Sequence, residues 1–173
     1  YIETTGYIIP TLHDVGRFLD DSKYMESSKR AAEWLLHKQN SDGSFSDIDQ
    51  NIPQVFDTGQ CLIGLNEMFE KTNQKKYFEA ARKASEWLLK NQEEDGSWIK
   101  NSYNYQPHSY YTRVASALIH FSKISKEDKY LFSGLKNIDW TIKNQKENGF
   151  FKYSSFSKNE YPVLHTIIYI LEG

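Results

Sequence analysis

Apolar residues recur with a helical period along most of the chain. The clearest case is segment 75–92, KKYFEAARKASEWLLKNQ, which contains no glycine or proline. Its apolar stripe at i, i+4, i+7 and i+11 consists of Tyr77, Ala81, Ala84 and Leu88. Lysine and glutamate fill most other positions, and the glycine that follows ends the pattern. Segments 24–39 and 130–145 repeat this design, so the sequence predicts three amphipathic helices.

A different kind of helix precedes each amphipathic one. Segments 4–19, 57–70 and 111–124 carry small and apolar residues on most faces, which is typical of a helix buried all round. Pro10 is expected to interrupt or kink the first of them unless it lies in the opening turn. A fourth copy begins at His165.

Three kinds of residue mark one internal repeat of 53 residues. The equally spaced positions are Trp34, Trp87 and Trp140; Tyr24, Tyr77 and Tyr130; and Gly43, Gly96 and Gly149. Alternating buried and amphipathic helices at this period predict an all-α fold, an α/α toroid or solenoid in which outer helices ring inner ones. A compact seven-helix bundle is the alternative.

We interpret residues 1–173 as one domain. Its repeats are expected at about 1–45, 54–98 and 108–151, followed by a fourth inner helix from 164. A closed toroid commonly has about six hairpins, so this chain is expected to form an incomplete toroid of about three and a half.

A turn with a recurring sequence follows each outer helix. The copies are KQNSDGSF (38–45), NQEEDGSW (91–98) and NQKENGFF (144–151). We expect Gln92 to bond backbone at the helix C-terminus, Gly96 to be left-handed and Trp98 to pack back over the hairpin. Three even copies favour a structural role over a catalytic one.

Segment 87–98, WLLKNQEEDGSW, resembles the QW repeat of triterpene cyclases, which braces the outer helices of an α/α toroid. Those enzymes protonate their substrate with a DxDD motif, and the nearest stretch here, 47–50, lacks the last aspartate. Protein prenyltransferases share the fold and hold zinc with an Asp-x-Cys pair and a histidine. Asp57 and Cys61 do not have that spacing, although they could meet with His165.

A second resemblance lies in ETTGY, FDTGQ, YYTR and HTIIY, at the starts of the inner helices. These stretches look like those of uncharacterised bacterial toroid proteins that accompany polysaccharide genes. Such proteins are similar in fold to six-hairpin glycosidases, polysaccharide lyases and sugar epimerases. The resemblance implies a carbohydrate-active protein, with fold as its only basis.

The inner-helix entrances share a threonine and differ at the residue before it. The threonines are Thr5, Thr58, Thr112 and Thr166, and the preceding residues are Thr4, Asp57, Tyr111 and His165. In a toroid these N-termini face one end of the central cavity, where helix dipoles favour anions. Thr and Asp are also good N-caps, so capping is the structural alternative for Asp57.

Four residues are the candidate catalytic set: His165, Asp57, Tyr111 and Arg113. His165 is suited to proton transfer, with Tyr111 or Asp57 as its partner. Arg113 lies in an apolar helix, where its charge needs a carboxylate, supplied either by Asp57 or by a uronic acid in a ligand. The candidate substrate-binding residues are Glu3, Phe56, Trp98, Tyr103, Tyr105, His108, Tyr110 and Tyr153.

The composition of the chain limits the classes of partner that we expect. Net charge is −2 with lysine and glutamate intermixed, which makes nucleic acid an unexpected partner, and no stretch reads as a membrane span. We expect no cofactor and no metal. The expected partner is a poly- or oligosaccharide, with a uronate-containing one among the candidates, and the missing half of the toroid is another. A soluble protein is expected, with the cytoplasm favoured and the compartment left open.

The leading hypothesis is therefore a toroid protein that acts on or binds an acidic polysaccharide, as a lyase, epimerase or glycosidase-like enzyme. A non-catalytic glycan- or protein-binding module and a terpenoid cyclase or prenyltransferase are the alternatives.

Overall fold

The computed structural model describes residues 1–47, 51–158 and 160–173. This part of the chain contains the α-helices α1 (Ile2–Leu19), α2 (Ser22–Lys38), α3 (Val55–Thr72), α4 (Lys75–Lys90), α5 (Thr112–Ser125), α6 (Asp128–Lys143) and α7 (Leu164–Glu172). Two short 3-10 helices, η1 (Tyr103–Tyr105) and η2 (Ser109–Tyr111), precede α5. The prediction of an all-α fold is confirmed.

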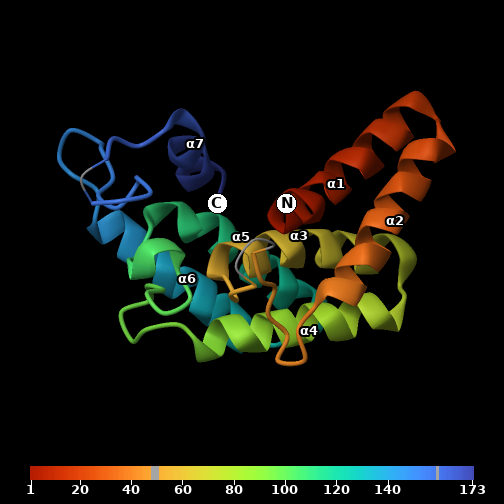
Figure 1. The fold of residues 1–173 in the computed structure, drawn as a ribbon, viewed down its shortest axis with the longest axis horizontal. Helices are drawn as coiled ribbons and strands as arrows, with labels where there is room; N and C mark the ends of the chain where they lie inside the picture. Colours follow the sequence, from red (N-terminus) through yellow and green to blue (C-terminus); the bar gives the residue numbers. More distant parts are fainter. Residues whose placement is uncertain (48–50, 159) are drawn as a thin grey trace.

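The helices form two layers, as the alternation of patterns predicts. The inner helices α1, α3, α5 and α7 pack in sequence order against one another, and α2, α4 and α6 each pair with the inner helix before them. The expectation that segment 4–19 is buried all round is wrong, because α1 buries one stripe of residues and leaves Phe18 and Leu19 exposed. Figure 1 shows the α1–α2 hairpin on one side of the molecule and α7 on the other, with α3, α4 and α5 between them. The described residues thus make three hairpins and a fourth inner helix of an α/α toroid.

The inner helix α3 lies at the centre of the core. It is flanked by α1 and α5 and backed by α4, which accounts for the burial of residues on most of its faces. Fully buried apolar side chains include Leu62 and Leu65 on α3 and Leu118 on α5. Pro10 lies inside α1, which runs from Ile2 to Leu19 as one helix, so the expected interruption at proline is wrong.

The recurring turns connect neighbouring outer helices. Gln92 Nε2 donates one hydrogen bond to Gly96 O (3.0 Å) within its own turn and one to Ser133 O (3.0 Å) on α6. Gln39 does the same with Gly43 O (3.0 Å) and Ala80 O (2.8 Å) on α4. The glutamine therefore binds the next outer helix, and the expectation that it caps its own helix is wrong.

The glycine and tryptophan of the turn behave as predicted. Gly96 has φ = 93°, a value that side chains rarely adopt, and a Cβ atom there would lie 2.4 Å from Lys136 O on α6. Asp95 Oδ1 accepts a hydrogen bond from Ser97 N (2.9 Å), which closes the turn. Trp98 is fully buried and donates from Nε1 to Leu88 O (2.9 Å), so it packs back onto its own hairpin.

In the described residues, no helix combines the length and apolar character needed to cross a membrane.

The glutamine contacts yield a prediction about stability. Gln92→Ala should lower the free energy of unfolding by about 1–3 kcal/mol, because it removes two donated bonds and the bond that Gln92 Oε1 accepts from Ser133 Oγ (2.7 Å). The matched change Gln145→Ala removes one exposed bond, to Gly149 O (3.1 Å), and should cost under about 1 kcal/mol. Urea denaturation followed by circular dichroism measures both, and equal losses would contradict this role for the glutamine.

Candidate functional site

A cavity of about 570 Å³ opens at the N-terminal ends of the inner helices. Residues from α1, α3, α7, η1, η2 and the loops between the helices line it. They are Tyr1, Glu3, Tyr7, Asp47, Ile52, Gln54, Phe56, Asp57, Asn101, Ser102, Tyr103, Asn104, Tyr105, Tyr110, Phe156, His165, Thr166 and Tyr169. The structure therefore brings together seven of the predicted residues: Glu3, Phe56, Asp57, Tyr103, Tyr105, Tyr110 and His165.

The repeated threonines brace the helix entrances that form this cavity. Thr58 Oγ1 donates to Gln54 O (2.7 Å), and Thr5 Oγ1 and Thr166 Oγ1 make equivalent bonds to backbone oxygens three or four residues earlier. Thr112 differs, because its Oγ1 donates to Tyr169 O (3.1 Å) and so fastens α5 to α7. The same hydrogen bond thus holds three of the four entrances, while the side chain before the threonine varies.

Asp57 is the most unusual titratable group in the cavity. It is only 9% exposed, and no residue in the described part of the chain donates a hydrogen bond to its carboxyl group. Burial in the first place, and then the nearby carboxylates of Glu3 and Asp47, raise the pKa of Asp57 to about 7. The capping interpretation is wrong, because α3 begins at Val55 after Gln54 and Asp57 lies within its first turn.

Arg113 lies beside the cavity but outside its lining. Its guanidinium forms an ion pair with Glu172 and donates from Nε to Gln60 Oε1 (2.9 Å). It also sits over the rings of Tyr169 (4.8 Å) and Tyr7 (5.6 Å), both of which line the cavity. The internal partner proposed from the sequence, Asp57, is therefore wrong, and Arg113 instead supports two lining aromatic rings.

Three other predicted residues are buried behind the lining. Tyr111 is fully buried, and its hydroxyl oxygen accepts a hydrogen bond from Ser102 Oγ (2.9 Å). Trp98 is also fully buried and packs edge-on against the Tyr111 ring. His108 Nε2 lies 2.9 Å from Tyr103 O. Burial lowers the pKa of the His108 imidazole. These placements give all three a packing role and leave them without access to a ligand in the cavity.

Tyr153 lies outside the cavity. Its ring packs against Trp140 with centroids 5.4 Å apart, and it lines a separate hollow of about 220 Å³ with Lys152 and Gln106. The expected contact between Tyr153 and a ligand at the helix entrances is therefore not supported by its position.

Several lining residues were not selected from the sequence. Tyr7 and Tyr169 lie in the second turns of inner helices, among apolar residues that predict only burial. Asn101 and Asn104 belong to the loop that follows Trp98. The sequence does indicate one of these lining residues, through the aromatic character of the loop after residue 150. Phe156 in this loop lines the cavity, where its ring packs against those of Tyr110 (6.1 Å) and His165 (5.6 Å).

The zinc-binding motif of a related fold does not form in the described residues. Cys61 is fully buried, its Sγ lies 3.6 Å from Ile2 O, and no three described His, Cys, Asp or Glu residues are placed to hold a metal ion. Of the acidic stretch 47–50, Asp47 lines the cavity, and residues 48–50 lie outside the described residues.

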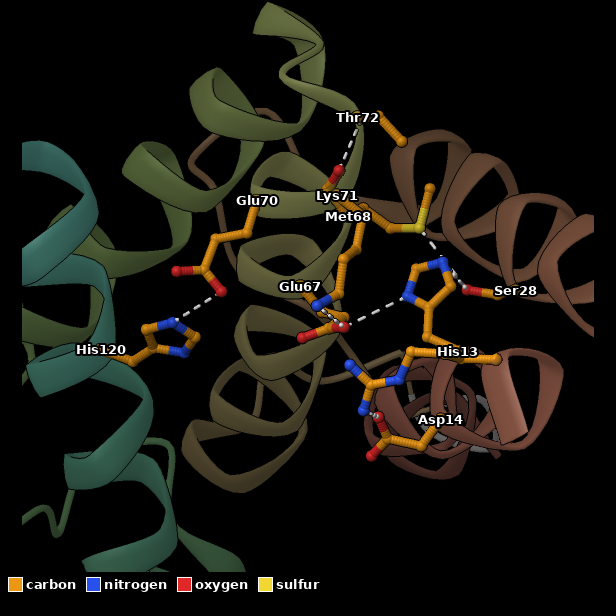
Figure 2. Close-up of polar contacts among 10 residues, drawn as sticks. His13, Asp14, Ser28, Glu67, Met68, Glu70, Lys71, Thr72 and His120 are labelled. Atoms are coloured by element: carbon orange, nitrogen blue, oxygen red, sulfur yellow. Dashed lines mark hydrogen bonds and ion pairs between the residues drawn. The ribbon is translucent and has the colours of Figure 1, made fainter.

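A serine–histidine–glutamate line occurs at a different place, between α1, α2 and α3. His13 Nε2 lies 3.2 Å from Ser28 Oγ, and His13 Nδ1 lies 3.3 Å from Glu67 Oε1, as Figure 2 shows. Lys71 Nζ also approaches that glutamate oxygen (3.4 Å). Ser28 is fully buried, so this line cannot present a nucleophile and instead joins three helices.

Comparisons with known proteins agree with this architecture. The profile of the squalene-hopene cyclase C-terminal domain family matches residues 1–172. The squalene–hopene cyclase of Zymomonas mobilis is 28% identical over 169 residues, which cover 93% of this chain and 24% of that protein. The chain thus spans about a quarter of that relative's length.

A solved structure shares the fold at lower sequence identity. It is a possible member of the GH105 family from Salmonella enterica, with a TM-score of 0.73 and 17% identity over 96% of this chain and 50% of that one. This likeness shows the α/α-toroid fold. With the family match over nearly its whole length, the chain belongs to the squalene-hopene cyclase C-terminal domain family.

Proposed function

We propose that this is a carbohydrate-active protein that holds a hydroxyl-rich sugar in the cavity and uses Asp57 as a proton donor. One observation carries the proposal: aromatic rings and amide groups surround a buried carboxyl group that no described residue pairs with. The fold shared with a possible GH105 member is compatible with such a role but does not specify it.

The rings form a continuous apolar wall. Phe56 packs against Tyr110 (5.6 Å) and Tyr169 (5.6 Å), and His165 packs against Tyr169 (5.7 Å). Flat rings suit the C–H faces of a sugar, while the amides of Gln54 and Asn101 at the same surface suit its hydroxyl groups. An apolar polyene would leave the Gln54 amide without a ligand partner, whereas Asn101 Nδ2 already donates to Asn91 Oδ1 (2.9 Å).

Asp57 is suited to general-acid chemistry. A carboxyl group with a pKa of about 7 keeps a substantial protonated fraction near neutral pH, whereas an ordinary aspartate does not. His165 is exposed on the first turn of α7 and lines the same cavity, so it can exchange protons with solvent and with a ligand. The proton-transfer pair we propose is therefore Asp57 and His165.

The charges of the lining favour a neutral sugar over the expected uronate. The described lining includes the acids Glu3, Asp47 and Asp57 but no lysine or arginine. Arg113, the residue expected to bind a uronate, is already paired with Glu172. The negative charge of a uronate would be repelled by the acidic residues of the cavity, so we propose neutral oligosaccharides as the more favourable ligands.

A terpenoid cyclase activity is the second candidate. The family match favours it, and a proton donor among aromatic rings could start a cyclisation and stabilise the carbocation. The amide and carboxylate groups of the lining count against it. Both candidates use Asp57, so substrate tests must separate them.

The functional prediction concerns turnover. Asp57→Asn should lower conversion of a neutral oligosaccharide by about 10²–10⁴-fold, because the amide cannot donate the acidic proton, while the dissociation constant should change only a few-fold. Wild-type activity should decline as pH rises above about 7, as Asp57 loses its proton. Mass spectrometry of products and calorimetric titration measure the two quantities.

Other outcomes of that experiment distinguish the alternatives. Full activity in Asp57→Asn would contradict the assignment of the proton donor. Sugar binding without any product would indicate a binding module, and conversion of a polyene but of no sugar would indicate a cyclase.

A second prediction concerns stability and pH. Because folding raises the pKa of Asp57 from 3.8 to about 7, folded protein holds this proton while unfolded protein releases it. The contribution of this proton to the free energy of unfolding is fully present at low pH. It is lost as pH rises from about 4 to about 7, and the loss amounts to up to about 4 kcal/mol.

Asp57→Asn should remove this loss, so its stability relative to wild type should grow between those pH values and then level off. Chemical denaturation across pH measures the difference, with the exposed Asp14→Asn as control. A constant difference between Asp57→Asn and wild type would show that Asp57 is ionised in the folded protein.

A further inference from the structure

Three carboxyl groups meet in the lining of the cavity, and the described lining contains no lysine or arginine to balance them. Glu3 lies in the first turn of α1, Asp57 in the first turn of α3, and Asp47 in the loop before α3. Arg113, behind the lining, is already paired with Glu172. The electrostatic argument that disfavours a uronate therefore also separates neutral ligands from positively charged ones, which the cavity attracts.

The amide donors of the lining are largely used within the protein. Asn101 Nδ2 donates to Asn91 Oδ1 (2.9 Å). Asn104 Nδ2 donates to Phe156 O (3.2 Å). By contrast, the lining carboxyl groups at the starts of α1 and α3 accept no hydrogen bond from any described residue. The cavity thus offers acceptors and is short of donors, so the ligand that fits it brings N–H or O–H donors of its own.

Tyr110 gives a separate indication that a polar group of a ligand binds beside Asp57. Its side chain lines the cavity and is 3% exposed, and its hydroxyl group makes no hydrogen bond with any described residue. The rings of His108 (4.6 Å) and Tyr111 (5.2 Å) pack against the Tyr110 ring and fix its position. Burial is the main cause that raises the pKa of Tyr110, and the nearby Asp57 carboxylate adds to it, so the hydroxyl keeps its proton. Two buried polar groups without partners among the described residues thus line one cavity, where a ligand would satisfy both.

The aromatic rings beside these groups are suited to a cation. Phe56, the residue before Asp57, packs its ring against those of Tyr110 (5.6 Å) and Tyr169 (5.6 Å). The Arg113 guanidinium already lies 4.8 Å from the centroid of the Tyr169 ring. Because the face of an aromatic ring attracts positive charge, this wall can contact a protonated amine as well as the C–H face of a sugar.

We propose that the ligand of this cavity is an amino sugar whose protonated amine binds among Glu3, Asp57 and Tyr110. The inference rests on the proposed function, because it specifies the sugar that the same cavity holds. An ammonium group supplies three N–H donors and one positive charge, and a carboxyl group accepts from it in either protonation state. A neutral sugar provides hydroxyl groups without the charge, and a uronate provides a charge of the wrong sign. The amine is therefore the substituent that this lining selects.

A metal ion is a poorer candidate for the positive charge. Within residues 1–47, 51–158 and 160–173, no three His, Cys, Asp or Glu side chains are placed to hold one. A metal ion also has no N–H group for the unpaired acceptors, whereas an ammonium group needs only one or two carboxyl groups beside it.

The test compares sugars that differ only in charge and in the amine. The 173-residue chain is titrated calorimetrically with β-1,4-linked trisaccharides of glucosamine, of N-acetylglucosamine and of glucose. At slightly acidic pH, where the sugar amine is protonated, the glucosamine trisaccharide should bind about tenfold more tightly than the other two. This advantage should shrink as salt concentration rises, because mobile ions screen the carboxylates.

Substitution of Glu3 locates the effect in the cavity. Glu3→Gln should reduce the advantage of the glucosamine trisaccharide to about threefold or less, because it removes one negative charge while keeping the shape of the side chain. Glu26→Gln is the matched control, because Glu26 is exposed on α2, outside the lining, and its substitution changes the net charge equally. Circular dichroism verifies that both variants are folded.

The outcomes separate this inference from the proposed function. The inference is overturned if the glucosamine and glucose trisaccharides bind equally well, or if Glu3→Gln and Glu26→Gln change the preference alike. In both cases a sugar still binds, so the proposed function stands. Equal binding of a plain alkylamine and the glucosamine trisaccharide would also overturn the inference, because charge alone would then explain it. Binding of none of the three sugars would contradict the proposed function itself and the inference with it.

Discussion

The glutamine amide that joins each turn to the following outer helix is the contact on which this structure depends. One side chain satisfies a carbonyl of its own turn and a carbonyl of the neighbouring helix, as at Gln39 and Gln92. The two turns therefore make the same contacts with the outer helix that follows. Because the hairpins are held alike, the N-termini of the inner helices gather at one end of the arc and enclose a cavity.

The chemistry of the site follows from this regular frame. Threonines brace the entrances, so neighbouring positions are free to differ, and only one of them places a carboxyl group in the cavity wall. Asp57 is buried by the packing of α3 between α1 and α5, and this burial, with no hydrogen-bond donor among the described residues, keeps its proton near neutral pH. Among the repeated helix entrances, the position of Asp57 is thus the one that carries a buried carboxyl group.

The fold could be predicted from the sequence because tryptophan, tyrosine and glycine each recur at a spacing of 53 residues. Each of these residues has a structural role within its own repeat. The site could be predicted only in part. Aromatic residues near the entrances were recognised, but sequence does not distinguish a ring that faces the cavity, such as Tyr110, from one packed behind it, such as Tyr111. Arg113 shows the second limit, because its partner Glu172 lies 59 residues away and no pattern indicates that pairing.

The protonation state of Asp57 tests the central claim most directly, because the proposed acid chemistry requires a carboxyl group that retains its proton. Carbon-13 NMR of the aspartate carboxyl carbons, assigned with Asp57→Asn, follows that proton as pH changes. The structure predicts a titration midpoint at about 7. A midpoint near the ordinary value of about 4 would contradict the account, because Asp57 would then be ionised at neutral pH and could not serve as the proton donor.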